Sequence, residues 1–195
     1  MTNTPTKVLI VEDEPVTRRG LQLFLQQLPG IDVVDIVDSG ESAVTRAQEL
    51  NPDVVLMDIG LPGMDGIATA KEIKSADAGK RVLMLTANST NEAIFAAFNA
   101  GADGYVLKNS FAHSLELAIR TVRCGSVWLD PHIAQTILRM AVESPKASLK
   151  VDLSQTEQKV LKQLANTSCE NGVCYVQPSF VADLRRFRPT ANNGS

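Results

Sequence analysis

The chain has 195 residues, of which 44% are hydrophobic and 21% are charged, and its formal net charge is −3 at pH 7. These values are typical of globular domains, and the length suffices for one domain with a full hydrophobic core plus a smaller second one. No stretch approaches the roughly 18 to 20 apolar residues that span a bilayer, so we expect no membrane-spanning helix and no membrane partner.

The N-terminus and the cysteines indicate the compartment. The first residues, MTNTPTKVLIVEDE, lack the basic region and the apolar stretch of a signal peptide. Cys124, Cys169 and Cys174 show no metal-site or disulfide pattern, although the last two could pair if oxidised. The sequence therefore predicts a cytoplasmic protein with reduced thiols.

Charge is distributed unevenly along the chain. Residues 1–142 hold 12 Lys and Arg against 17 Asp and Glu, whereas residues 151–195 hold 5 against 4. Phosphate contacts need clustered Lys and Arg, so any contact with nucleic acid is expected in the C-terminal part.

Strand-like apolar runs alternate with segments of helical period in the first 125 residues. The expected strands are Val8–Val11, Val33–Val37, Val54–Met57, Val82–Leu85 and Tyr105–Leu107. The expected helices are Pro15 to Leu28, Glu41 to Leu50 with Ser39 as N-cap, Ile67 to Ser75, Ser89 or Thr90 to Gly101, and Ser110 to Arg123. This alternation predicts an α/β domain over residues 1–125, with a five-stranded parallel sheet covered by helices on both faces.

Polar side chains lie where four of the expected strands end. They are Glu12-Asp13, Asp58, Thr86 and Lys108. The carboxyl ends of parallel strands share one edge of a sheet, so these side chains should converge there. Three carboxylates close together repel one another unless a hard cation joins them, and their oxygens suit Mg²⁺. A lysine and a hydroxyl beside the cation would stabilise a phosphoryl group in transfer, with Asp58 as the candidate nucleophile.

Four segments, in this order, carry a resemblance. VLIVEDEP, DVVLMDIGLPGMDG, VLMLTA and GADGYVLKNS, within residues 7 to 123, resemble the receiver domain of two-component response regulators. The non-proline Asn109 and the segment GSVWLDPHIAQTILRMAVES resemble the NarL/FixJ group of this family, which has a LuxR-type output. The resemblance implies a flavodoxin-like fold and a phosphorylated signalling switch, with weak autophosphatase activity at most.

The resemblance also implies roles for the residues at the strand ends. Asp58 would accept a phosphoryl group from a sensor histidine kinase. Asp13 and Glu12 would hold Mg²⁺ together with Asp58, and the backbone carbonyl of Gly60 would supply another ligand. Lys108 would pair with the phosphate.

A switch is implied as well. Thr86 would hydrogen-bond a phosphoryl oxygen and swing inward, and Tyr105 matches the family's switch aromatic, whose inward rotamer accompanies Thr86. The added charge of about −1.5 to −2 would bias a two-state loop and helix pair.

The C-terminal third divides into three parts. Residues 126–143 contain an amphipathic helix from residue 130, which in the NarL/FixJ group tethers the receiver to its output domain. Residues 144–152 have the composition of a flexible linker. Residues 153–195 begin like the first helix of a LuxR-type helix-turn-helix, with a capping box at Ser154 and Glu157, but no recognition helix follows. We expect a partial or degenerate output segment, short and mainly helical or disordered.

Alternative functions remain open at this point. The output is expected to regulate transcription by binding DNA, or else to act through protein–protein contacts, and a homodimer is compatible with both. A phosphatase of the haloacid-dehalogenase type, which also uses an Asp nucleophile and Mg²⁺, is a further alternative. That family has a second Asp two residues after the nucleophile, where this chain has Gly60.

Overall fold

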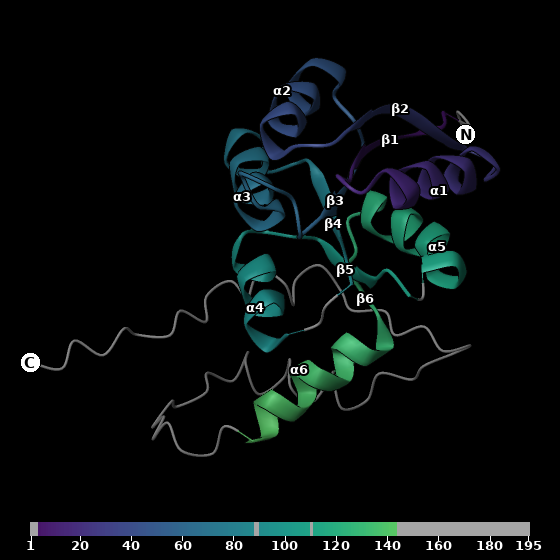
Figure 1. The fold of residues 1–195 in the computed structure, drawn as a ribbon. Helices are drawn as coiled ribbons and strands as arrows, with labels where there is room; N and C mark the ends of the chain where they lie inside the picture. The colour runs from purple at the N-terminus through teal and green to yellow at the C-terminus, as the bar shows by residue number, and fades with distance from the viewer. Residues whose placement is uncertain (1–3, 88–89, 110, 144–195) are drawn as a thin grey trace, which may run out of the picture.

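The computed structural model describes residues 4–87, 90–109 and 111–143 (Figure 1). In chain order these residues form β1 (Thr6–Val11), α1 (Pro15–Gln26), β2 (Ile31–Val37), α2 (Gly40–Leu50), β3 (Val54–Asp58), α3 (Gly66–Ala76), β4 (Arg81–Thr86), α4 (Asn91–Asn99), β5 (Gly104–Leu107), α5 (Phe111–Arg123), β6 (Trp128–Leu129) and α6 (Pro131–Glu143). Within this part of the chain, none of the helices combines the length and the apolar character that crossing a bilayer requires.

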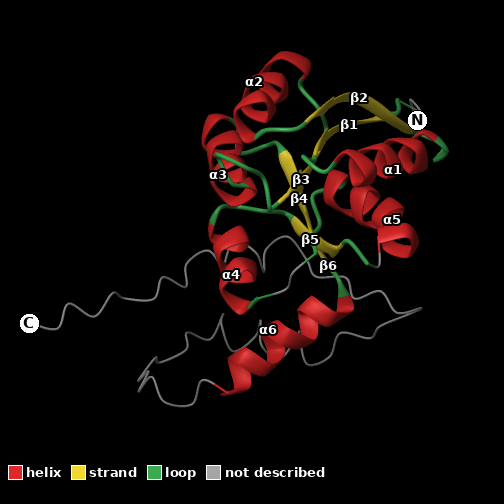
Figure 2. Cartoon of the chain, viewed as in Figure 1, coloured by secondary structure: helices red, strands yellow, loops and turns green. Residues whose placement is uncertain are grey.

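The strands form one sheet in the order β2-β1-β3-β4-β5-β6, and every neighbouring pair is parallel (Figure 2). This confirms the predicted α/β fold with a parallel sheet. The predicted strand count of five is wrong, because β6 adds a sixth strand at the edge, where Trp128 pairs with Gly104 and Leu129 with Tyr105. A strand of only two residues is too short to display the alternation from which strands are recognised.

Helices cover both faces of the sheet. In Figure 1, α1 and α5 lie on one side of the sheet, and α2, α3 and α4 lie on the other. On β1, Val8 and Ile10 belong to the core cluster with residues of α1 and α5, whereas Leu9 and Val11 belong to the cluster with residues of α2, α3, α4 and α6. All four side chains are at most 1% exposed. Strands buried on both sides explain why the apolar runs in the sequence are continuous instead of alternating.

Side-chain caps fix where several helices begin. Ser39 accepts from the Ser42 amide at the start of α2, and Thr90 accepts from the Ala93 amide at the start of α4. Both are among the predicted N-caps. Asp65 caps α3 in the same way. Each cap satisfies a helix-terminal N–H group at the edge of the sheet where the polar residues gather.

Gly66 allows α3 to start directly above the end of β3. A Cβ at this position would lie 1.8 Å from the backbone oxygen of Asp58. The Gly66 amide donates to the Ile59 carbonyl at 3.1 Å, so the loop after β3 folds back onto the strand end. The close approach requires a residue without a side chain.

A buried ion pair fastens α3 to the strands beside it. Lys74 Nζ lies 2.6 Å from Asp103 Oδ2, and both side chains are 8% exposed. Asp103 also accepts from the Val82 amide at 2.9 Å and pairs with Arg81 at 3.1 Å. The carboxylate is therefore fully satisfied in a site from which water is largely excluded.

The expected helix after residue 130 is present as α6, Pro131–Glu143. The predicted linker, 144–152, and the predicted helix-turn-helix segment, 153–195, lie outside the described residues.

Candidate functional site

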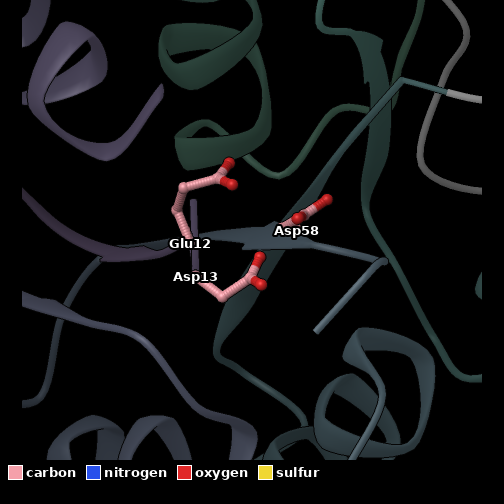
Figure 3. Close-up of side chains that lie close together, drawn as sticks. All are labelled: Glu12, Asp13 and Asp58. Atoms are coloured by element: carbon pink, nitrogen blue, oxygen red, sulfur yellow. The ribbon is translucent and has the colours of Figure 1, made fainter. Parts of the chain in front are cut away.

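Three carboxylates meet at the carboxyl edge of the sheet. β1 and β3 are neighbours, with Val11 opposite Met57, so the residues that follow Val11 reach the level of Asp58. One oxygen each from Glu12, Asp13 and Asp58 lies within 4.8 Å of the others (Figure 3). The predicted convergence of these acids is present in the structure.

Lys108, the residue that follows β5, completes the cluster. Its Nζ atom lies 2.8 Å from Glu12 Oε2, 3.0 Å from Glu12 Oε1 and 3.0 Å from Asp58 Oδ2. The Lys108 amide also donates to the Thr86 carbonyl at 2.7 Å, which holds the lysine at the end of β4. One ammonium thus bridges two of the three carboxylates, and 96 residues of sequence separate it from Glu12.

Burial and charge set the protonation of this cluster. The Glu12 side chain is fully buried, and burial raises the pKa of its carboxyl above the ordinary value, although hydrogen bonding to Lys108 opposes this. Burial also acts to lower the pKa of Lys108, but hydrogen bonds to Glu12 and Asp58 outweigh it, and the net pKa is raised. Lys108 is therefore a permanent cation at neutral pH.

The donor set fits a hard divalent cation. All three candidate ligands are carboxylates, which is the ligand type that Mg²⁺ prefers, and no His or Cys among the described residues joins the cluster. If all three carboxylates are ionised, the cluster and its one ammonium carry a net charge of about −2, which a divalent ion would balance. Gly60 lies beside the cluster, since a Cβ there would be 3.7 Å from Asp58 Oδ2.

Thr86 and Tyr105 form a second feature next to the acids. Thr86 ends β4 and is 5% exposed, and Tyr105 on the adjacent β5 is completely buried. Burial raises the pKa of the Tyr105 phenol, and its hydrogen bond with the Thr86 side chain opposes the rise. The tyrosine ring is thus packed inside the domain, with its hydroxyl hydrogen-bonded to Thr86.

Two neighbouring residues organise the loop that carries Glu12 and Asp13. The sequence places Glu14 in an acidic group at the start of a helix, but it does not indicate a role for Arg18. Glu14 is the N-cap of α1 and accepts from the amides of Val16 and Thr17 at 3.2 and 2.6 Å. Arg18 donates to the Glu12 carbonyl at 3.2 Å and lies 3.5 Å from Asp38 on the neighbouring loop. The spacing of Glu14 just before a proline at N1 was an available capping signal, whereas the Arg18 contacts depend on the fold.

Comparison with known proteins assigns the chain to a family. The family described as "Response regulator receiver domain" matches residues 8–120. The nitrate/nitrite response regulator protein NarP of Escherichia coli is 33% identical over 83% of this chain and 75% of its own length. The transcriptional regulatory protein LnrK of Bacillus subtilis is 34% identical over 81% of this chain and 76% of its own length.

Solved structures agree with this assignment. A LuxR-family two-component response regulator from Aurantimonas sp. SI85-9A1 superimposes with a TM-score of 0.69 at 33% identity, covering 71% of this chain and 99% of that chain. The RcsB response regulator of Salmonella typhimurium, at 22% identity and a TM-score of 0.66, shares the fold. The chain therefore belongs to the two-component response regulators, and its receiver domain is of the kind found in the NarL-type transcriptional regulators.

Proposed function

We propose that this protein is a phosphorylated switch in which Asp58 accepts a phosphoryl group from a sensor histidine kinase. The observation that carries the proposal is the position of Asp58, which shares one cluster with two further carboxylates and lies 3.0 Å from the Lys108 ammonium. An Asp58 oxygen forms a bond to phosphorus as the phosphorus–nitrogen bond of a phosphohistidine breaks, and the bonding electron pair stays on the imidazole nitrogen.

Glu12, Asp13 and Asp58 would hold Mg²⁺, together with the backbone carbonyl of Gly60. The ion supplies positive charge that offsets the phosphoryl oxygens during transfer. Lys108 supplies a further fixed charge, and its two bonds to carboxylates keep the ammonium aimed at the place where phosphate charge would develop. Arg18 and Glu14 orient the loop that bears the acids.

The bound phosphoryl group would change the state of Thr86 and Tyr105. The phosphoryl group adds a charge of about −1.5 to −2 to the site, and the Thr86 hydroxyl can donate to one of its oxygens. The inward position of Tyr105, hydrogen-bonded to Thr86, is the conformation that we associate with the loaded site. Coupling between the two hydroxyl groups would pass the change from β4 to β5.

The output is proposed to be the regulation of transcription, since the curated relatives include NarP and LnrK, whose names describe regulators. Binding of the phosphorylated protein to DNA, lost on deletion of residues 151–195, would support this output. Absence of any gel shift at low salt would instead point to output through protein contacts. Light scattering with and without a phosphoryl mimic would reveal whether a homodimer forms.

The phosphorylation itself is tested with acetyl phosphate as donor. Wild-type protein should become labelled in the presence of Mg²⁺ and not in excess chelator, and Asp58→Asn should remain unlabelled while keeping its circular dichroism spectrum. Persistent labelling of the Asn variant would overturn the site. Continuous release of phosphate over many cycles would favour the phosphatase alternative, whereas a single stoichiometric label supports the switch.

A further inference from the structure

Asp130, the residue that precedes α6, is hydrogen-bonded to the backbone of Tyr105, the proposed switch tyrosine. The Asp130 amide donates to the Tyr105 carbonyl at 3.1 Å, next to the β5–β6 pairing of Tyr105 with Leu129. The Asp130 carboxylate accepts from the His132 amide at 3.1 Å, and the backbone carbonyl of Asp130 accepts from the Ala134 amide at 2.9 Å. One residue therefore both holds β5 and begins α6.

Asp130 makes these bonds away from water. It is 5% exposed, which is rare for an aspartate without a structural role. Hydrogen bonds in such a site are strong, and leaving a buried donor unpaired is costly. The Tyr105 backbone and the α6 cap should consequently move together instead of separating.

Apolar packing joins the same elements a second time. Ile133 in the first turn of α6 is fully buried in the cluster that contains Tyr105 and Leu107, and Ile137 packs against that cluster one turn later. α6 also contacts α4, beneath which it lies in Figure 1. In this structure α6 is part of the receiver's own core.

We propose that the Thr86–Tyr105 pair and the first turn of α6 form one coupled unit, so that occupancy of the Asp58 site is transmitted through Asp130 to α6. This inference rests on the proposed function of Asp58. The inward Tyr105 and the docked α6 occur together here, so loading the site should tighten the docking of α6. By thermodynamic reciprocity, weakening the α6 cap should weaken occupancy of the site by the same factor.

The chain carries its own reporter at the junction. Trp128 on β6 is the single tryptophan of the sequence, lies two residues before Asp130 and is 5% exposed. Its emission reads the environment of the β6–α6 junction without interference from another indole. The rates of amide hydrogen exchange at His132 and Ala134 report the stability of the two hydrogen bonds of the cap.

The test uses the full chain with Mg²⁺ and beryllofluoride, a phosphoryl mimic whose binding is followed by fluorine NMR. Loading should slow exchange at His132 and Ala134 by about fivefold or more, as expected for a typical coupling free energy, and should shift Trp128 emission. Asp130→Ala should weaken beryllofluoride binding by a similar factor. Asp130→Asn retains a good N-cap and should bind like wild type.

A matched control separates coupling from loss of stability. Ser39→Ala removes the N-cap of α2, a helix that packs on α3, β1 and β2, and should leave beryllofluoride affinity unchanged. Tyr105→Phe removes only the hydroxyl group, so this variant should still bind beryllofluoride, but binding should no longer slow amide exchange at His132 and Ala134. This variant tests the coupling if Asp130→Ala does not fold.

The outcomes distinguish this inference from the proposal on which it rests. Wild-type protein that binds no beryllofluoride would overturn the proposed function, and the inference with it. Wild-type protein that binds the mimic with unchanged α6 exchange and unchanged Trp128 emission would overturn the coupling alone. Equal affinity of Asp130→Ala and wild type would do the same.

Discussion

Replacing Lys108 by Met should expose the balance of charge in the acid cluster. The Lys108 side chain is 20% exposed, and its Nζ lies 2.8 Å from the fully buried Glu12 and 3.0 Å from Asp58. Methionine keeps most of the side-chain volume but leaves both carboxylates without their cation. Breaking a buried pair in this way typically costs about 3 to 5 kcal/mol, so we expect the free energy of unfolding at pH 8 to fall by about 3 kcal/mol.

The cost should depend on pH because Glu12 can take up a proton. Burial already raises its pKa in the folded wild-type protein, so the folded state binds more protons than the unfolded state across the interval between the two pKa values. The contribution of Glu12 to the free energy of unfolding is therefore greatest below that interval and falls as pH rises through it. Loss of the lysine removes a contact that lowers this pKa, so the interval extends to higher pH and the deficit of the variant should be larger at pH 8 than at pH 5.

Urea denaturation of wild type and Lys108→Met at pH 5 and pH 8, with chelator and with Mg²⁺, measures these differences. At one Mg²⁺ concentration set to about 100 times the variant's Kd, the variant should gain about 2.7 kcal/mol. The wild type should gain less at the same concentration, because its lysine already neutralises part of the acidic charge and weakens Mg²⁺ binding, so Mg²⁺ should reduce the deficit. Lys71→Met, at an exposed position on α3, is the matched control and should change stability by less than about 0.5 kcal/mol. A deficit in Lys108→Met that is the same at both pH values and unaffected by Mg²⁺ would refute the reasoning.

Three further predictions concern other parts of the domain. Asp103→Ala leaves the buried Lys74 ammonium without its carboxylate and should lower the free energy of unfolding by about 3 to 5 kcal/mol in urea denaturation; a loss below about 1 kcal/mol would contradict it. Gly66→Ala places a methyl group 1.8 Å from a backbone oxygen and should destabilise the domain by about 1 to 3 kcal/mol, whereas Gly20→Ala, with open space around it on α1, should stabilise it by about 1 kcal/mol; equal melting temperatures for the two would count against the packing argument. Asp13→Ala should weaken Mg²⁺ binding in calorimetry by at least tenfold without loss of fold, and unchanged affinity would remove this residue from the proposed ligand set.

Much of the fold followed from local patterns in the sequence. The buried strands were recognisable because continuous β-branched and apolar runs such as Val54–Met57 are bounded by polar residues and turns. The convergence of Asp58, Asp13 and Lys108 followed from topology alone, since parallel strands place their carboxyl ends together. No knowledge of side-chain rotamers was needed for these features.

Other features depend on tertiary contacts that leave no local pattern. β6 was not predicted because a strand of two residues is too short to show an alternation of apolar and polar residues, and its formation depends on pairing with the neighbouring β5. The reach of Glu12 to Lys108 depends on the rotamers of two long side chains, which only the packed core selects. The burial of Ile133 in the same cluster as Tyr105 could not be predicted either, because the apolar stripe of an amphipathic helix does not indicate which surface it packs against.

Identifying the modified residue tests whether Asp58 itself carries the phosphoryl group. After incubation with acetyl phosphate and Mg²⁺, borohydride reduction of an aspartyl phosphate yields homoserine at the modified position, which peptide mass spectrometry locates. We expect homoserine at position 58 of the wild-type protein and none in protein treated with chelator. Homoserine at Asp13 or at another carboxylate, with Asp58 unmodified, would contradict it.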